Sequence, residues 1–527
     1  MVKKIGNYLP FIVFGLAVLF LLGVRLISFN NNVLDHDEIE WLYGIHRMRI
    51  DPRPFIGFEA HTSGPLSTYI LSLINFFVGQ PQTIHLRLFS FFLLIVPSMA
   101  LLFWGKKNAI NYAGLAFMTA LLSINFKPIE SLVEDFFCYN TEFQILLFTA
   151  ILYMILQGSL TRIRVFCFAI LLVLFFFIKI QVVFLVAYFG LAMLFKLIYH
   201  RMAGLLKVYL ITAILLIAMI LAYLVISGTL MEAYYIYIEK NILYQANFSG
   251  DQVDWLLIVK TMLRIFYHQF RYLSLSFGIS FALLLYGLFR KHIKIPSVNV
   301  SLFNHPIVLS GLLLLVSLVT VLLSKNNFGH YYINAFFPMS IFFSALFQWL
   351  TSKGFSKKVK WTYKIGLVCC FIGAANGHYL MKSAQFLLSN HQERSKLKLG
   401  FPKGYQLDSR MKDWLEAHRS AGNQTILYLG WFGSEMLYYE FGHVFEPVYR
   451  SANFYWYQST YVSGNQHFFQ HEEANLMEDL TKKPPFYIVD CEDLLGKVHN
   501  TQFTKYLQTH YVLVRSEPSF KIFQRQN

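Results

Sequence analysis

Acidic side chains are concentrated in the segment that follows the first apolar run of the chain. Asp35, Asp37 and Glu38 lie within four residues, and Glu59 and His61 follow in the same segment. A positioned carboxylate can take the proton of an attacking hydroxyl group, which is general base catalysis. Aromatic residues interleaved with these acids predict that the segment packs against the membrane, where an acidic patch is costly without a purpose. The alternative is a solvated loop whose charges only keep it outside the membrane.

Two of these acids also match a metal-binding pattern. Asp35, His36 and Asp37 form the Asp-x-Asp sequence that holds a divalent cation in enzymes that use nucleotide sugars. Nucleotide sugars are cytosolic, whereas this segment is predicted to lie on the opposite side of the membrane. The five cysteines form no Cys-x-x-Cys pair and predict no zinc site. We therefore expect no cofactor, with a divalent metal at Asp35 and Asp37 as the alternative.

A second acidic segment precedes the apolar run at 141–158. It contains Asp135, and Glu142 begins the run itself. An ionisable residue at the edge of a membrane span requires a partner or a water-filled cavity, which makes Glu142 a candidate substrate-binding residue. The alternative is a helix cap, because negative charge is favoured at a helix N-terminus. Both interpretations of Glu142 stay open.

Cations are fewer on this side of the membrane, and a lipid phosphate would need them at the depth of the headgroups. They are Arg87, Lys127, Lys179, Arg264, Lys325 and His330. The short turn at 324–332 is the best candidate, because it places Lys325, His330 and Tyr331 between two apolar runs. The alternative is an interfacial anchor, a role in which Lys and Tyr are common.

Long apolar runs must position these residues. Hydrophobic residues make up 56% of the 527 residues and charged residues 14%, whereas a soluble domain is about half apolar and about a quarter charged. Runs of the length that spans a bilayer predict about eleven transmembrane helices in a mostly α-helical membrane protein. They lie near 8–28, 85–104, 109–126, 141–158, 164–178, 182–198, 206–226, 262–288, 306–323, 331–350 and 361–382. The shorter run at 64–78 predicts a helix that lies at the membrane interface.

Basic residues predict the orientation of these helices. With the N-terminus in the cytoplasm, sixteen Lys and Arg fall in short cytoplasmic segments, which is a positive-inside pattern. All fourteen Asp and Glu before residue 382 then fall on the outer side or at an outer helix end. We expect a multi-pass protein of the inner (plasma) membrane. The net charge of +16 belongs to these loops, and no basic face on a soluble module predicts nucleic-acid binding.

The chain changes character after residue 382. Polar residues dominate 383–527, and the predicted topology places this part outside the cytoplasm. Strand-like runs begin at Thr425 and Phe486, and the runs at 511–514 and 520–523 predict a closing hairpin. The sequence therefore predicts two domains, a transmembrane catalytic domain at 1–382 and a small extracytoplasmic α/β domain at 383–527.

In this order, these motifs resemble the GT-C superfamily, and within it the protein O-mannosyltransferase and aminoarabinose-transferase branch. The resemblance covers nearly the whole chain. It implies an inverting glycosyltransferase that takes its sugar from a polyprenyl-phosphate carrier, with an extracytoplasmic acceptor and membrane lipid as further partners. The positions that match the family's motifs are Asp37 with Glu38, Glu59, His61, Glu142 with Asp135 as the alternative, Lys325, His330 and Tyr331.

The sequence departs from the family's pattern directly after Glu59. Ala60 stands where aminoarabinose transferases have Lys. His61 is followed by Thr-Ser-Gly-Pro-Leu, whereas the family's version of the motif is His-Pro-Pro-Leu. These differences imply that other residues hold the phosphate of the carrier.

The resemblance also implies a division of roles among the charged residues. Asp37 would be the base toward the acceptor hydroxyl group. A second set of carboxylates would stabilise an oxocarbenium-like transition state or hold the acceptor, as carboxylates do in glycosidases. These are Glu38, Glu59 and Glu142. Cations would stabilise the leaving phosphate. These are Arg87, Lys325 and His330.

Two other classes of membrane protein are the alternatives. A transporter or flippase places ionisable residues near the bilayer midplane and often has repeated halves. In this sequence the charges gather at outer helix ends, and no internal repeat is visible. A lipid-linked glycan ligase would use a related carrier but would usually have Arg-rich outer loops, and these loops are rich in acids.

Overall fold

Two compact units make up the protein, whose structure is a computed structural model. The structure describes residues 2–29, 36–58, 63–79, 81–107, 139–241, 259–260, 306–323, 329–352, 385, 388–389, 408–418, 424–429, 445–447, 466–491, 493 and 495–526. Contacts within the chain group Met1–Asn32, Thr62–Ser67 and Ile84–Pro402 into the first unit, and Val33–His61, Thr68–Thr83 and Lys403–Asn527 into the second. The domain boundary at residue 382 stays a prediction.

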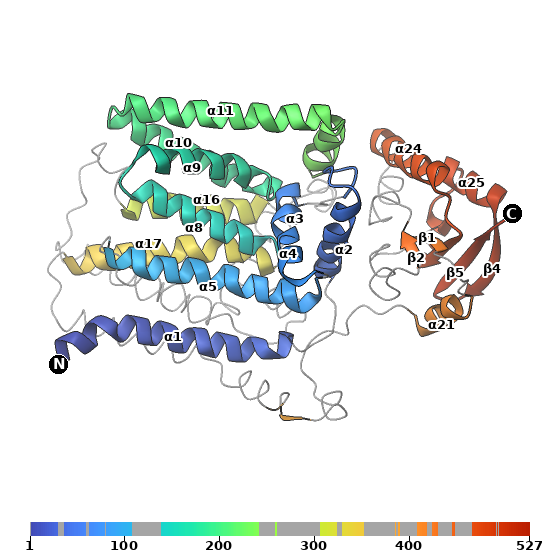
Figure 1. The fold of residues 1–527 in the computed structure, drawn as a ribbon, viewed down its shortest axis with the longest axis horizontal. Helices are drawn as coiled ribbons and strands as arrows, with labels where there is room; N and C mark the ends of the chain where they lie inside the picture. The colour runs from blue at the N-terminus through green and yellow to red at the C-terminus, as the bar shows by residue number, and fades with distance from the viewer. Residues whose placement is uncertain are drawn as a thin grey trace. The chain divides into compact units, whose positions relative to one another are not determined.

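The first unit contains long helices that run side by side (Figure 1). They are α1 (Val2–Phe29), α5 (Thr83–Lys107), α8 (Glu142–Gln157), α9 (Arg162–Phe176), α10 (Val183–Tyr199), α11 (Ala203–Ile226), α16 (Pro306–Leu323) and α17 (Ile333–Ser352). Short elements lie next to them in the chain, namely η1 (Ile180–Val182), α12 (Leu230–Glu232), the π-helix η2 (Ala233–Glu239) and η4 (Gly329–Tyr332). Each long helix covers one of the apolar runs predicted from the sequence.

A helix must also be long and apolar enough to cross a bilayer before it counts as a predicted membrane span. Among the described residues, three helices are long and apolar enough to cross a bilayer, namely Thr83–Trp104, Ile180–Tyr199 and Ala203–Ile226. Shorter apolar helices include Phe14–Gly23, Glu142–Gln157, Pro306–Leu322 and Ile333–Leu346. The runs predicted at 109–126, 262–288 and 361–382 lie outside the described residues. A mostly helical protein with a small sheet is therefore confirmed, and the number of eleven spans stays a prediction.

Hydroxyl groups inside these helices are satisfied by the helix itself. Ser98 donates to the carbonyl of Leu94 at 2.7 Å, and Ser317 donates to the carbonyl of Leu313 at 2.8 Å. An unsatisfied polar group in a hydrocarbon environment costs several kcal/mol, roughly. Because each hydroxyl bonds to the turn before it, these serines fit an apolar helix without a partner on a neighbouring helix.

Helix α8 is the central helix of the first unit. Eleven of its sixteen residues are buried, whereas α11, although longer, buries only Tyr209 and Leu224. Its aromatic residues pack against two neighbours, with Phe148 stacked on Phe175 of α9 at 5.6 Å and Tyr153 against Phe337 of α17 at 6.0 Å. A helix that is apolar on all sides is either buried among other helices or exposed to lipid, and α8 is of the buried kind. Any charged residue at the start of α8 therefore lies among other helices.

The acidic segment of the second unit forms a helix and a tight loop. Helix α2 (His36–Ile50) carries the first acids, and α3 (Pro65–Ser72) and α4 (Ile74–Val78) follow. The run at 64–78, predicted as one interfacial helix, is thus two short helices that meet at Leu73. Phe76 and Phe77 are 84% and 86% exposed. Exposed aromatic residues of this kind are typical of a membrane interface.

The C-terminal part of the second unit contains a five-stranded mixed sheet. Its strands are β1 (Gln424–Leu429), β2 (Phe445–Pro447), β3 (Tyr487–Cys491), β4 (Tyr511–Glu517) and β5 (Phe520–Arg525), in the order β2-β1-β3-β5-β4. The predicted strands and the antiparallel hairpin of β4 and β5 are confirmed. Strand β1 pairs in parallel with both β2 and β3, which the sequence did not indicate.

Helices cover both faces of this sheet. On one face, Met411 and Leu415 of α21 (Ser409–Ala417) pack on Ile426 and Val489. On the other, α24 (Gln466–Lys482) and α25 (Gln502–His510) pack on Leu427 and Ile488. Consecutive strand residues point to opposite faces, so residues 426–429 of β1 and 487–489 of β3 are buried on both faces and are apolar. The predicted α/β class of the C-terminal part follows from this alternation.

The start of α21 is fixed to the β4–β5 hairpin by one carboxylate. Asp408 caps the helix by accepting a hydrogen bond from the backbone amide of Arg410 at 2.9 Å. The Arg410 guanidinium and then the Ser519 hydroxyl donate to the same carboxylate and hold the pKa of Asp408 well below its usual range. The carboxylate therefore stays ionised and keeps α21 on the sheet at neutral pH.

Candidate functional site

Several helix ends meet in the first unit. They are the start of α8, the turn between α9 and α10, the end of α16 and the start of α17, as the residues that line a small shared cavity show. Helices that follow one another in the chain run in opposite directions here, so the end of one helix lies beside the start of the next. In the orientation predicted from the sequence, this is the outer end of the helices, where the acids and the scarce cations gather.

A buried ion pair joins two of these helix ends. The Lys179 Nζ atom donates to Glu142 Oε1 at 2.7 Å. Glu142 has no exposed surface and Lys179 is 5% exposed. Glu142 also lies in the first turn of α8, where the helix dipole favours a negative charge. Glu142 therefore lies at a helix start and also has a charged partner, and its predicted role in substrate binding stays a prediction.

An aromatic ring covers the ammonium group of this pair. Lys179 Nζ lies 4.6 Å from the centre of the Tyr331 ring, a cation–π contact that adds to the ion pair. Tyr331 was predicted as a site residue, and the structure brings it together with Glu142. Their common partner, Lys179, appeared in the sequence only as one of several outer cations.

The cavity around the pair is small. It is bounded by Ile145, Gln181, Val182, Thr320, Val321 and Asn334 together with the three residues above. Its volume is about 10 Å3, which is room for about one water molecule. A sugar does not fit there, so in this conformation the pair positions the helix ends and does not line a substrate pocket.

Residues 63–67, which lead from the acidic segment into α3, are hydrogen-bonded to the turn that carries Lys179. The Gly64 amide donates to the carbonyl of Ile178 at 2.6 Å, and Ser63 forms an isolated antiparallel bridge with Lys179. The Ser67 hydroxyl donates to the same carbonyl of Ile178 at 3.2 Å. The chain that follows Glu59 and His61 is thus fixed on this turn by its own backbone.

The start of α8 holds the same residues from the other side. The hydroxyl groups of Ser63 and Thr141 lie 3.0 Å apart. The Gln144 side-chain amide donates to the carbonyl of Ser67 at 3.3 Å. The start of α3 therefore lies between the start of α8 and the α9–α10 turn, the two elements that the ion pair joins.

Only glycine fits at position 64. A Cβ atom built there would lie 2.0 Å from the carbonyl oxygen of Phe177 and 3.0 Å from the Tyr237 hydroxyl. Tyr237 belongs to the π-helix η2, donates to the carbonyl of Phe176, and stacks on the Phe177 ring at 6.3 Å. Short π-helical stretches occur frequently at functional sites. Here η2 presses an aromatic ring against the turn that Gly64 touches.

Two buried guanidinium groups lie where α1 ends and α5 begins. Arg87 Nη1 donates to the carbonyl of Ser28 at 2.5 Å, and Arg25 Nη1 donates to Ser90 Oγ at 2.8 Å. Arg25 and Arg87 are 0% and 2% exposed. The Arg25 guanidinium also lies 5.8 Å from the centre of the Phe143 ring, next in sequence to Glu142. A buried Arg in an apolar helix is rare and is a functional-site candidate.

The remaining predicted site residues are less fully placed. Glu38 is buried in α2 without exposed surface. Asp35, Glu59, His61, Asp135 and Lys325 lie outside the described residues, as do the side chains of Asp37 and His330. In the part of the chain that is described, no group of three or more His, Cys, Asp or Glu could hold a metal. The roles predicted for all these residues stay predictions.

Sequence reasoning passed over Lys179 and Arg25 for different reasons. Lys179 is the only charged residue between Arg164 and Lys196, which is a usable signal once Glu142 is known to need a partner. Arg25 lies inside the apolar run at 8–28, which it does not interrupt. An ionisable residue within a predicted span is itself the signal that would have identified it.

Replacing Gly64 by Ala tests the close approach of α3 to the α9–α10 turn. The added Cβ must displace backbone, so we expect Gly64→Ala to destabilise the protein by about 1–3 kcal/mol. Gly204→Ala is the matched control, because a Cβ at Gly204 meets nothing within 4 Å. The measurement is the thermal unfolding midpoint in detergent. Equal midpoints for the two variants would contradict the packing at Gly64.

A double-mutant cycle tests the ion pair. Glu142→Gln and Lys179→Met should each cost about 3–5 kcal/mol, because each leaves an uncompensated buried charge or polar group. The double variant should cost clearly less than the sum, because neither charge is then left alone.

The control for this cycle is the exposed pair of Glu478 and Lys482 on α24. Glu478→Gln should cost about 0.5 kcal/mol or less, as is usual for surface pairs. Additive losses for Glu142 and Lys179 in chemical or thermal unfolding would show that the two side chains do not depend on each other.

Comparison with known proteins identifies the fold. No protein-family model matches the chain, and no curated protein matches its sequence. ArnT from Cupriavidus metallidurans, an aminoarabinose transferase solved with undecaprenyl phosphate bound, is similar at a TM-score of 0.53 and 11% identity, over 97% of this chain and 98% of that chain. Its apo form gives 0.51 and 12%, over 97% of each chain.

A more distant similarity is to the oligosaccharyltransferase from Archaeoglobus fulgidus, solved with Zn and sulfate. Its TM-score is 0.46 at 13% identity, over 97% of this chain and 73% of that chain, which is too low to carry an argument. The similarity to ArnT extends over nearly the whole chain, as the sequence motifs predicted. The protein therefore has the fold of ArnT, which is the fold that the resemblance to the GT-C superfamily implied.

Proposed function

We propose that the protein is an inverting glycosyltransferase of the membrane that moves a sugar from a polyprenyl-phosphate carrier to an acceptor outside the cytoplasm. The acceptor class is a glycolipid, a glycan or a protein. The observation that carries the proposal is the fold, because ArnT has this fold over nearly the whole chain and was solved with undecaprenyl phosphate bound. The buried pair of Glu142 and Lys179 supports it as the device that fixes residues 63–67, which follow the acidic segment, on the α9–α10 turn.

We also propose that Glu59 and His61, which precede Ser63 by four and two residues in the sequence, bind substrate.

The proposed chemistry is a single displacement at the anomeric carbon. The acceptor oxygen forms a bond to that carbon, and the bond from the carbon to the phosphate oxygen of the carrier breaks. The proton of the acceptor hydroxyl group passes to the Asp37 carboxylate, which acts as general base. Polyprenyl phosphate leaves with the electron pair, and attack from the opposite face inverts the configuration. No redox step or external proton source is required.

Charged side chains would stabilise the two partners of this step differently. Carboxylates favour an oxocarbenium-like transition state, which is the role proposed for Glu38 and Glu59. Cations favour the leaving phosphate, which is the role proposed for Arg87, Lys325 and His330. We assign Glu142 a positioning role, because its carboxylate is paired with Lys179 and the cavity beside the pair is too small for a sugar.

Transfer by the purified protein tests the proposed reaction. With a panel of synthetic polyprenyl-phosphate sugars and acceptor-rich membranes, we expect the wild type to release free polyprenyl phosphate. Asp37→Asn should lower the rate by about 100-fold or more, which is the usual contribution of a general base. Release is measured by chromatography of the lipid products.

Asp51→Asn is the control, because Asp51 is another acid of the same segment and is bonded to the exposed Arg53. It should keep the wild-type rate. Equal release by the wild type and Asp37→Asn would remove Asp37 as the base. No release from any donor would favour the transporter or ligase alternatives.

The proposed site also requires a specific topology. We propose about eleven spans with the N-terminus in the cytoplasm and residues 383–527 outside it. Alkaline phosphatase folds only outside the cytoplasm, so a fusion after Asn527 should be active and a fusion after Ser159 inactive. The ratio of phosphatase activity to fusion protein on an immunoblot is the measurement. The reverse pattern would place the acids in the cytoplasm and exclude the proposed donor side.

A further inference from the structure

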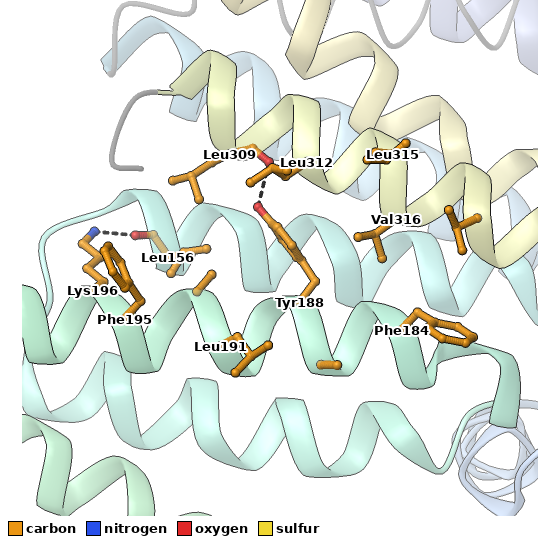
Figure 2. Close-up of a pocket in the computed structure, with 13 residues that line it drawn as sticks. Leu156, Phe184, Tyr188, Leu191, Phe195, Lys196, Leu309, Leu312, Leu315 and Val316 are labelled. Atoms are coloured by element: carbon orange, nitrogen blue, oxygen red, sulfur yellow. Dashed lines mark hydrogen bonds between the residues drawn. The ribbon is translucent and has the colours of Figure 1, made fainter. Parts of the chain in front are cut away.

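An apolar groove of about 560 Å3 runs between α10 and α16 (Figure 2). Its walls include Phe184, Leu191, Leu312, Leu315 and Val316. Among the described residues that line it, only two carry a strongly polar group. They are Tyr188, whose hydroxyl donates to the carbonyl of Leu309 at 2.7 Å, and Lys196. The tyrosine is satisfied within the wall, so Lys196 supplies the charge of the groove.

The groove opens toward the surroundings of the bundle. Leu191 and Leu315 on its two walls are 65% and 57% exposed. Exposed leucines such as these face the lipid hydrocarbon in a membrane protein, whereas their exposure to water would cost free energy. A hydrocarbon chain can therefore enter sideways from the bilayer, without an opening at either end.

One end of the groove is positively charged. Lys196 Nζ donates to the carbonyl of Leu156 at 2.5 Å, at the C-terminus of α8. Arg164 Nη1 donates to the carbonyl of Ser159 at 2.8 Å and lies 3.2 Å from a Cβ built on Gly158. Both cations thus converge on the α8–α9 turn. The whole stretch 143–231 contains no Asp or Glu to balance them.

The length of the groove matches one leaflet of a bilayer. Phe184 and Lys196 lie at its two ends (Figure 2) and are twelve residues apart on α10. At 1.5 Å per residue this is about 18 Å, close to the ~15 Å of half a hydrocarbon core. An acyl chain whose headgroup lies at Lys196 would fill the groove and end near Phe184.

A polyprenyl carrier fits the distribution of charge less well. In the proposed reaction cations at the outer ends of the helices bind its phosphate, on the side of the membrane opposite to Lys196. Its tail would then reach Lys196 and leave that ammonium group beside hydrocarbon. An anionic lipid with the opposite orientation places its phosphate at the charged end.

We propose that the groove between α10 and α16 is a binding site for an anionic phospholipid. One acyl chain lies along the two helices, and the phosphate is bound by Lys196 and Arg164. The predicted orientation makes this the cytoplasmic leaflet, which carries anionic lipids. The bound chain completes the packing of α10 against α16.

Native mass spectrometry of the delipidated full-length protein tests this site. We expect dioleoylphosphatidylglycerol, whose phosphate charge no choline balances, to bind about 25-fold more tightly than dioleoylphosphatidylcholine, because each of the two cations contributes about fivefold. Lys196→Gln should weaken phosphatidylglycerol binding about fivefold, and Lys196→Arg should retain it. Leu312→Trp, which fills the groove, should weaken binding of the chain without changing any charge.

Two control variants lie on α11, which does not line the groove. Lys207→Gln removes a nearby cation, and Leu215→Trp adds bulk at an exposed apolar position, and both should bind as the wild type does. Thermal unfolding midpoints, measured without lipid, identify any variant that fails to fold. If Lys196→Gln fails to fold, the variants Lys196→Arg and Leu312→Trp decide the outcome. Equal binding of the two phospholipids would overturn the proposal. The proposal would also be overturned if Leu312→Trp lost polyprenyl-phosphate binding but retained phosphatidylglycerol binding.

Discussion

The packing of the helices in the first unit depends on one buried pair of opposite charges. A lone carboxylate or ammonium group taken out of water costs several kcal/mol, roughly, so neither Glu142 nor Lys179 tolerates burial without the other. The two residues are 37 positions apart, and each lies at a helix end. The pair therefore requires that the start of α8 and the turn between α9 and α10 lie at the same place.

That requirement extends to the acidic segment. The backbone of residues 63–67 bonds to the same turn, and Gly64 passes too close for any side chain. Tyr237 supports the turn from η2, and Tyr331 covers the ammonium group. Elements that are far apart in the sequence thus converge on Lys179.

The features that could be predicted from the sequence are those that depend on residues close together in the chain. Helices such as α8 and α16 coincide with apolar runs, because both a protein interior and a lipid environment leave a continuous apolar signal. Glu142 was identifiable because an acid at the edge of such a run is costly. Its partner was not, because the pairing depends on how α9 turns into α10. Strand β2 has three residues and ends in Pro447, so only its pairing with β1 makes it a strand.

The ion pair also links the packing of the helices to the binding of an anion. A phosphate that attracts Lys179 competes with Glu142 for the same ammonium group. Its binding free energy is then reduced by the free energy that the pair contributes to helix packing. By thermodynamic reciprocity, formation of the pair weakens the binding of such an anion by the same factor by which the bound anion weakens the pair. Donor affinity and the stability of the bundle are in that case two measurements of one coupling.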